Sequence, residues 1–582
     1  MTILAGVVSL CGKIEVPPEL SQALRNGISR FKDDVVIESI SRYAHLFKVD
    51  INAFKSRGHF FESEVGTLMI AGEPLIADGG SSVERCHDVD RLFKEFREGK
   101  TRGLKLATGT YCGIYFDESA GCLQIFCDKM GVRPIYYAII DGFIVYTSAL
   151  RILESIPFIP KVIDVQGTAE IACFGYPLST RTAYQNIMTV HAGEIVGFDK
   201  GGERHIRYWN WAEIANEGLL SEPLAEYAWR LFLDGLQRRL HGEQAVLSFL
   251  SGGLDSRAIA GALTELKVKV ASINFAPPNT QDQAFAKCFA KSIDAYHSEY
   301  PVNADVVNDP HRTKLVRSWI ESLRAQPFFS NIKRTILWSG DGGSVGMGAV
   351  YLTPDIISTA RLRGYAAATD AFFIHNNWSL SPRLFSADRA ESMMSRPRDG
   401  MLAELNSLGV RDRGKAFYCF LMVNDQRRHL QKHFEAIDLT RLELQLPFFD
   451  AALIEFVMRG DIEAYLGHAF YMRWIASSSI SMNSTPWQAY PGHVPCHLPI
   501  LTSLKYQWGG NPFDAITIRR MKQATIKRGL AMIFQRCFPS HLLSRPKLVV
   551  IVLALMMGKS HLQYLIKMAD AFCRPASVSC RK

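Results

Sequence analysis

A six-residue motif at 251–256 (SGGLDS) joins an apolar run to a helical pattern. The apolar run, 245–250, predicts a strand, and residues 257–266 repeat apolar side chains at helical spacing. Where glycines turn a strand directly into a helix, backbone N–H groups and the positive end of the helix dipole face one point. The motif therefore predicts an α/β unit that holds a phosphate group.

The side chains of this turn suit the same purpose. Ser251 and Ser256 add hydroxyl donors, and Asp255 adds a hard oxygen ligand for Mg²⁺. The lysine of the GxxxxGK[ST] loop is missing, which excludes the usual cradle of kinases and GTPases. We expect a pyrophosphate-binding loop, made by Leu250, Ser251, Gly252, Gly253, Leu254, Asp255 and Ser256.

The spacing of apolar residues changes near residue 210, from strand-like to mostly helical. This change predicts two domains, 1–210 and 211–582. The first has short β-rich runs such as 134–140 and 143–147, joined by Asp141-Gly142, which is typical of a hairpin turn. In the second, a further apolar run at 268–275 completes a βαβ unit with a parallel sheet, and the rest is mostly helical.

Composition narrows the class of protein. The net charge of +9 is not gathered into a basic block, so it argues against a nucleic-acid groove. The 12 cysteines include no CxxC pair, so we expect reduced thiols in a cytoplasmic protein. The apolar run 548–557 is about half of what would cross a bilayer. We expect it to be a buried core segment and expect no integral membrane segment.

Ordered motifs in both halves of the chain resemble those of the asparagine-synthetase superfamily. In the first half these are 128–137 (DKMGVRPIYY, like RDxxGxRPLYY) and 145–150 (VYTSAL). In the second half they are SGGLDS, 339–343 (SGDGG, like SGxGxD), 443–450 (ELQLPFFD, like ExRxPFLD) and 545–547 (RPK, like RxK).

The resemblance implies a fold of α+β plus α/β type. A degenerate Ntn glutaminase-like αββα domain would precede an adenine nucleotide α-hydrolase-like (ATP pyrophosphatase) synthetase domain. ATP and Mg²⁺ would be the cofactors. Asn274 and Phe275, at the carboxyl edge of the sheet where the family binds adenine, and Ser339 and Gly340 would join the nucleotide site.

The chain departs from the glutamine-hydrolysing members at their catalytic cysteine. The N-terminal strand reads AGVVSL from Ala5, so alanine stands where we expect the nucleophile, and alanine cannot attack an amide. Cys11 could serve only if the residues before it were removed, and the prolines that follow at 17–18 make a poor strand. We therefore expect an inactive glutaminase domain.

Without internal ammonia, the amine must come from elsewhere. Two relatives fit: β-lactam synthetases, whose amine lies within the substrate, and lasso-peptide cyclases, whose amine is a peptide N-terminus. The segment 340–348 (GDGGSVGMG) is most similar to the cyclases. The resemblance then implies a ribosomal precursor peptide and a leader-peptide protease as partners.

Three residues are candidates for catalysis by resemblance. Asp341 would join Asp255 at the metal, because Ser344 stands where the family has its second carboxylate; a loop-capping role is the alternative. Glu443 would relay a proton, or be buried and structural. Lys547 would face the α-phosphate and oxyanion, or be a surface lysine.

Other interpretations stay open. An asparagine synthetase or β-lactam synthetase would act on a small carboxylate, and a peptide-binding scaffold would have no activity. His429 and His433 lie one helical turn apart, but the glutamate of HExxH is missing, so we expect a solvated helix face there.

Overall fold

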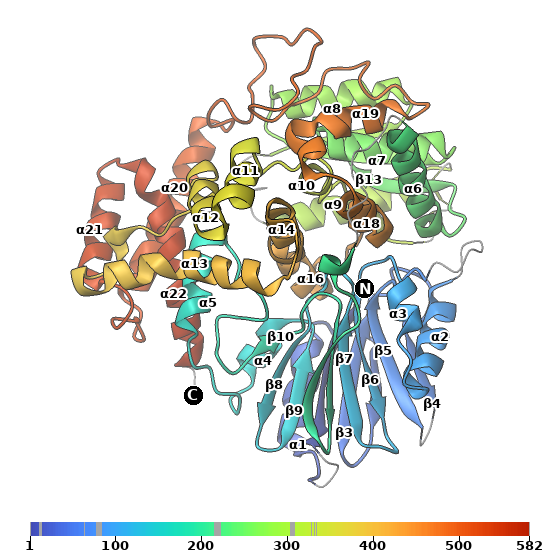
Figure 1. The fold of residues 1–582 in the computed structure, drawn as a ribbon, viewed down its shortest axis with the longest axis vertical. Coiled ribbons are helices and arrows are strands. Elements are labelled where there is room, and N and C mark those ends of the chain that lie inside the picture. The colour runs from blue at the N-terminus through green and yellow to red at the C-terminus, as the bar shows by residue number, and fades with distance from the viewer. Residues whose placement is uncertain are drawn as a thin grey trace.

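The computed structural model describes residues 2–10, 14–62, 65–76, 84–214, 223–302, 309–327, 329–330, 332 and 334–580. A β-sandwich forms one end of the molecule, and a parallel sheet surrounded by helices forms the other (Figure 1). The last helices of the chain form a separate group at one side (Figure 1).

The N-terminal part is a sandwich of two antiparallel six-stranded sheets. Apolar side chains of both sheets, such as Leu4 and Ile114, meet between them. Helix α1 (Pro18–Ile28) covers the first sheet, and helix α2 (Arg85–Arg97) covers the second. This confirms the αββα arrangement.

The strands follow in this spatial order. The first sheet contains β10 (Met188–Thr189), β8 (Tyr136–Ile140), β9 (Phe143–Thr147), β1 (Thr2–Ser9), β3 (Ala44–Asp50) and β2 (Val36–Ile40). The second contains β12 (Gly202–Arg207), β11 (Glu194–Asp199), β7 (Cys122–Cys127), β6 (Tyr111–Asp117), β5 (Gly66–Gly72) and β4 (His59–Glu62). Asp141 and Gly142 join β8 to β9 with positive φ at both residues, which confirms the hairpin.

The second domain is built on a five-stranded parallel sheet. Its order is β15 (Tyr296–Pro301), β14 (Lys269–Ala276), β13 (Ala245–Phe249), β16 (Ile336–Trp338) and β17 (Glu443–Gln445). The predicted βαβ unit is confirmed as β13, α7 (Leu254–Glu265) and β14. Helix α7 begins at Leu254, before the predicted residue 257, because Gly253 is the last residue with extended backbone.

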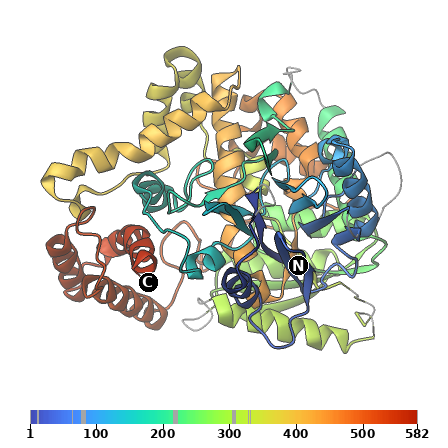
Figure 2. The ribbon, with the colours of Figure 1, turned by 90° about the horizontal axis from the view of Figure 1, so that it is seen from below.

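The C-terminal helices belong to a second apolar core, to which Ala169 and Ala172 of the first domain also contribute. They are α20 (Ala515–Ile533), α21 (Arg545–Met556) and α22 (Gln563–Ser579), and α22 packs against α5 (Val165–Phe174) of the first domain (Figure 2). The apolar run 548–557 falls in α21, where only one face is buried: Leu548 is 1% exposed, whereas Val550 is 64% exposed. The expected core segment is therefore a half-buried helix.

A disulfide joins Cys537 to Cys580 in this helical group. The expectation that all the thiols are reduced is therefore wrong for these two residues, which sequence spacing could not pair. Among the described helices, none combines the length and apolar character that crossing a bilayer requires.

Polar contacts join the two domains. Arg133 of the first domain donates from Nη2 to Oε1 of Glu443 at 2.8 Å. Glu73 accepts at Oε2 from Nε2 of Gln445 at 3.0 Å and contacts Nε2 of His241 at 2.6 Å through Oε1. The side chains of Arg133, Glu73 and Glu443 are all buried. Groups placed this deep fix how the sandwich sits on the parallel sheet.

Candidate active site

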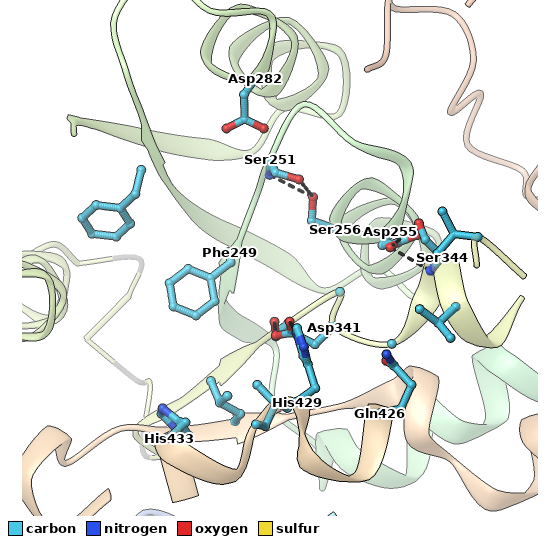
Figure 3. A pocket seen from close by; sticks show the side chains of 18 of the residues that line it. Phe249, Ser251, Asp255, Ser256, Asp282, Asp341, Ser344, Gln426, His429 and His433 are labelled. Carbon is cyan, nitrogen blue, oxygen red and sulfur yellow. Dashed lines mark hydrogen bonds and ion pairs between the residues drawn. The ribbon is translucent and has the colours of Figure 1, made fainter. Parts of the chain in front are cut away.

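A large cavity lies at the carboxyl ends of β13, β14 and β16. Its volume is about 1510 Å³, and its lining includes Ser251, Asp255, Ser256 and Asp341 (Figure 3). Parallel α/β sheets bind ligands at this edge. Of the predicted nucleotide-binding residues, Leu250, Ser251, Asp255, Ser256, Asn274, Phe275, Ser339 and Gly340 line the cavity.

The SGGLDS turn holds its shape through its own hydroxyl groups. The backbone N–H of Ser251 donates to Oγ of Ser256 at 2.8 Å, and the two hydroxyl oxygens also lie 2.8 Å apart. The N–H of Gly252 donates to Oδ1 of Asp282 at 2.8 Å. A Cβ on Gly252 would lie 2.7 Å from Cα of Asp282, so only glycine fits there. Gly253 and Leu254 then begin α7, whose first-turn N–H groups make an anion site.

A second glycine loop follows β16 and packs directly on the first. A Cβ on Gly340 would lie 2.5 Å from the backbone N of Ser256, and a Cβ on Gly343 would lie 2.6 Å from Cγ of Asp255. Close packing of the two loops depends on the missing side chains. The two motifs, far apart in sequence, thus form one wall of the cavity.

Asp255 is held by protein donors. Its Oδ2 accepts from the backbone N and Oγ of Ser344 at 2.9 and 2.8 Å, and its Oδ1 accepts from Oη of Tyr471 at 2.9 Å. Burial raises the pKa of Asp255 to about 6, and the charge of Asp341 adds to the rise while these hydrogen bonds oppose it. A cation beside the two carboxylates would relieve this repulsion.

Asp341 faces the loop from below and is paired with a histidine (Figure 3). Its Oδ2 accepts from Oγ of Ser339 at 2.5 Å, and its Oδ1 lies 3.1 Å from Nε2 of His429. Burial raises the pKa of Asp341, but contact with His429 more than offsets burial, so this pKa lies below its ordinary value. His429 and His433 both line the cavity, and the side chain of His429 is 50% exposed, so the expected solvated helix face forms an open wall of the cavity.

These residues fit a magnesium ion that is shared with a substrate phosphate. A carboxylate offers about four lone-pair sites, and the hydrogen bonds above leave sites free on both Asp255 and Asp341. Mg²⁺ usually binds one or two carboxylates and keeps waters and phosphates as its other ligands. Within the described part of the chain, no group of three His, Cys, Asp or Glu side chains could hold a metal without such help.

Glu443 is not among the residues that line the cavity, although its neighbours Leu442 and Leu444 are. Glu443 is the first residue of β17, a strand whose three residues are all buried. Its carboxylate is fully buried and paired with Arg133. The burial of Glu443 and its pairing with Arg133 favour the structural alternative, and the role of proton relay stays a prediction.

Lys547 is also remote from the cavity lining. It lies in the first turn of α21, is exposed, and donates from Nζ to the backbone O of Phe385 at 2.5 Å. The C-terminal helices carry it to the side of the molecule (Figure 1). Three other cationic residues do line the cavity: Lys314, Arg317 and Lys432.

Ala5 lies in the middle of β1, opposite Thr147 and Phe47 on the two neighbouring strands. It is completely buried against the core that α1 covers. A methyl group in this packing offers no nucleophile. Cys11, the proposed substitute, lies outside the described residues.

Several residues of the site were not predicted from the sequence. His493 lines the cavity, and His468 and Tyr471 contact Ser344 and Asp255 beside it. The single available signal was the spacing of His429 and His433, and without the fold it pointed equally to a surface.

Comparisons with known proteins agree with this architecture. Residues 77–209 match the glutamine amidotransferase domain family, and residues 229–337 match the asparagine synthase family. Glutamine-hydrolysing asparagine synthetase 3 of Bacillus subtilis is 27% identical over 181 residues, which is 31% of this chain and 29% of that protein. Asparagine synthetase 2 of the same bacterium is 24% identical over 187 residues, 30% of this chain and 25% of that protein.

The chain thus spans less than a third of the length of either relative. Among solved structures, the glutamine phosphoribosylpyrophosphate amidotransferase of Bacillus subtilis aligns with 52% of this chain and 90% of its own, at 11% identity and a TM-score of 0.25. Together, the two family matches show a region similar to glutamine amidotransferase domains followed by a region similar to asparagine synthases.

Proposed function

We propose that this protein is an ATP-dependent, AMP-forming amide ligase that cyclises a ribosomal peptide, as lasso-peptide cyclases do. One observation carries the proposal: two glycine loops bring Asp255 and Asp341 to one wall of a cavity far larger than a nucleotide needs. An Asp or Glu side chain of the peptide would be adenylated. The α-amine of the same peptide would then displace AMP.

Different residues of this chain would bind the pyrophosphate, the adenine and the metal ion during adenylation. Ser251, Ser256 and the start of α7 would hold the pyrophosphate, and Asn274 and Phe275 would flank the adenine. Asp255 and Asp341 would hold Mg²⁺, which offsets the charge that develops on the phosphates. Lys314, Arg317 and Lys432 add positive charge to the same cavity.

The first domain argues for an amine that the substrate brings. Ala5 offers no nucleophile to release ammonia from glutamine. An α-amine has a pKa of about 7.7 to 8, so a useful fraction is neutral near pH 7. A precursor peptide would need its leader removed first, because a blocked N-terminus cannot attack. A leader-peptide protease is therefore the partner that we propose.

The size of the cavity favours a peptide. Pockets for small ligands span roughly 300 to 1,000 Å³. A cavity of about 1510 Å³ leaves room for several residues beside ATP. Apolar side chains line much of it, including Phe249, Val316, Leu430 and Leu442, and these suit a peptide better than a free amino acid.

The second candidate is an asparagine synthetase that acts on a small carboxylate. The named function of the two Bacillus subtilis relatives favours it. Such an enzyme would need free ammonia here, since Ala5 replaces the nucleophile.

Parallel assays with peptides and with free aspartate separate these two candidate functions. The purified protein would be incubated with ATP, Mg²⁺ and synthetic peptides that each carry a free α-amine and one Asp or Glu at a different distance from it. We expect one or more peptides to lose a single water while AMP and pyrophosphate accumulate. Free aspartate with ammonium should give no asparagine. Asparagine formation with no change in any peptide would contradict the peptide proposal.

A further inference from the structure

Two histidines join Ser344 to the cavity. Oγ of Ser344 lies 3.3 Å from Nε2 of His468, and Nδ1 of His468 lies 2.7 Å from Nδ1 of His493. His468 is 3% exposed, whereas His493 lines the cavity next to Tyr490. A continuous hydrogen-bonded chain thus runs from the carboxylate of Asp255 to an imidazole that faces the substrate space.

The backbone is shaped to place His468. Its φ of 66° and ψ of 17° put a non-glycine residue in the left-handed region. Such a conformation persists where the surrounding structure enforces it, and it is common at functional sites. A Cβ on Gly348 would lie 2.5 Å from Nε2 of His468, so a glycine makes room for the ring. The ring of Tyr490 stacks on His468 at a centroid distance of 5.6 Å.

The donor and acceptor of each hydrogen bond in this series follow from Asp255 at one end. Asp255 as a carboxylate can only accept, so Oγ of Ser344 must donate to it. The Ser344 oxygen therefore accepts from His468, which must carry its proton on Nε2. Nδ1 of His468 then accepts from Nδ1–H of His493. The unprotonated nitrogen of His493 is then Nε2, which takes no part in this series of hydrogen bonds.

Burial favours the neutral form of both imidazoles. Burial and the neighbouring His493 lower the pKa of His468 to about 3. Burial, with His375 nearby, also lowers the pKa of His493 below its usual value. Neutral rings are what the proton positions above require.

We propose that Nε2 of His493, with its tautomer set by His468 and Ser344, is the base that accepts the proton of the attacking amine. This inference rests on the proposed amide-forming function. The neutral amine attacks the acyl-adenylate carbonyl, the new C–N bond forms, and the bond from that carbon to the AMP oxygen breaks with its electron pair. The proton that the nitrogen loses passes to His493. His468 is a positioning residue, since it acts only through His493.

The test separates adenylation from capture of the adenylate. Hydroxylamine is a strong nucleophile that is already neutral at pH 7, so it can trap the adenylate as a hydroxamate without help from a base. His493→Ala should form hydroxamate from ATP and a substrate peptide as the native protein does. Its rate of cyclic peptide formation should fall by about 10² to 10⁴, the usual contribution of a general base. Added imidazole should restore part of that rate.

His497→Ala is the matched control, because His497 is exposed in the same segment and does not line the cavity. It should leave both reactions unchanged. An equal loss of hydroxamate and cyclic peptide in His493→Ala would overturn the base assignment, as would an unchanged cyclisation rate. If the native protein formed neither product, the proposed function would fail and the base assignment with it.

Discussion

At the scale of single residues, Asp255 is the side chain on which the proposed chemistry most depends. Asp255→Asn keeps the size of the side chain but removes the charge that would bind Mg²⁺. We expect ATP–pyrophosphate exchange to fall by about 10² or more, in line with the loss of other groups that stabilise transition-state charge. Thermal melting should change little, because removing a carboxylate whose burial raises its pKa relieves a buried charge.

The control for Asp255→Asn is Asp294→Asn. The side chain of Asp294 is 98% exposed, so the same chemical change there should affect neither exchange nor melting. If Asp255→Asn kept native ATP–pyrophosphate exchange, the assignment of this loop to metal and phosphate binding would be wrong.

The resemblance implies that Lys547 contacts the α-phosphate, whereas the structure places it outside the cavity lining. If it faced the α-phosphate, Lys547→Ala would cost about 10² to 10³ in rate. Because its Nζ is bound to the carbonyl of Phe385 away from the cavity, we expect ATP–pyrophosphate exchange to be unchanged. A large loss with native-like melting would restore the role that the RxK motif suggests.

At the scale of elements, the contact between the two glycine loops positions the site. Gly340→Ala would push a methyl group against the backbone of Ser256, and backbone cannot yield as a flexible side chain does. We expect a loss of about 1 to 3 kcal/mol in stability, the usual cost of overpacking, and weaker ATP binding measured by calorimetry. Gly197→Ala is the control, since its Cβ would lie 3.9 Å from the nearest atom. Equal behaviour of the two variants would show that the loops do not pack closely.

The sequence was sufficient for elements that local patterns define. The strand, glycine turn and helix around SGGLDS, the hairpin at Asp141-Gly142 and the parallel sheet all follow from local periodicity and turn chemistry. It was insufficient where tertiary packing decides the outcome. Glu443 could not be assigned to one face of its short strand, and nothing local showed that His468 and His493 would meet.

At the scale of the whole molecule, buried polar contacts hold the sandwich on the parallel sheet. Burial raises the pKa of Glu73, but His241, Arg334 and Gln445 outweigh it and lower this pKa to about 2, below the usual 4.5. A carboxyl group with a lowered folded-state pKa stabilises the protein above the unfolded value and loses that effect as pH falls. Glu73 should therefore stabilise the domain interface fully above pH 4.5 and lose this contribution toward pH 2.

Glu73→Gln tests this interface. At pH 7 we expect the variant to be less stable in urea by about 1 to 3 kcal/mol, the cost of leaving buried polar partners poorly paired. The difference from the native protein should close as pH falls from about 4.5 toward 2. A difference independent of pH would mean that the charge of Glu73 does not hold the domains together.

In the proposed reaction, ATP activates a peptide carboxylate, which the same peptide's amine then captures. The most direct measurement follows a heavy-oxygen label placed in the side-chain carboxylate of a substrate peptide. We predict that one labelled oxygen appears in AMP for each cyclic product, because adenylation and displacement leave that oxygen on the phosphorus. Label found in inorganic phosphate, or cyclisation with no label in AMP, would contradict the account.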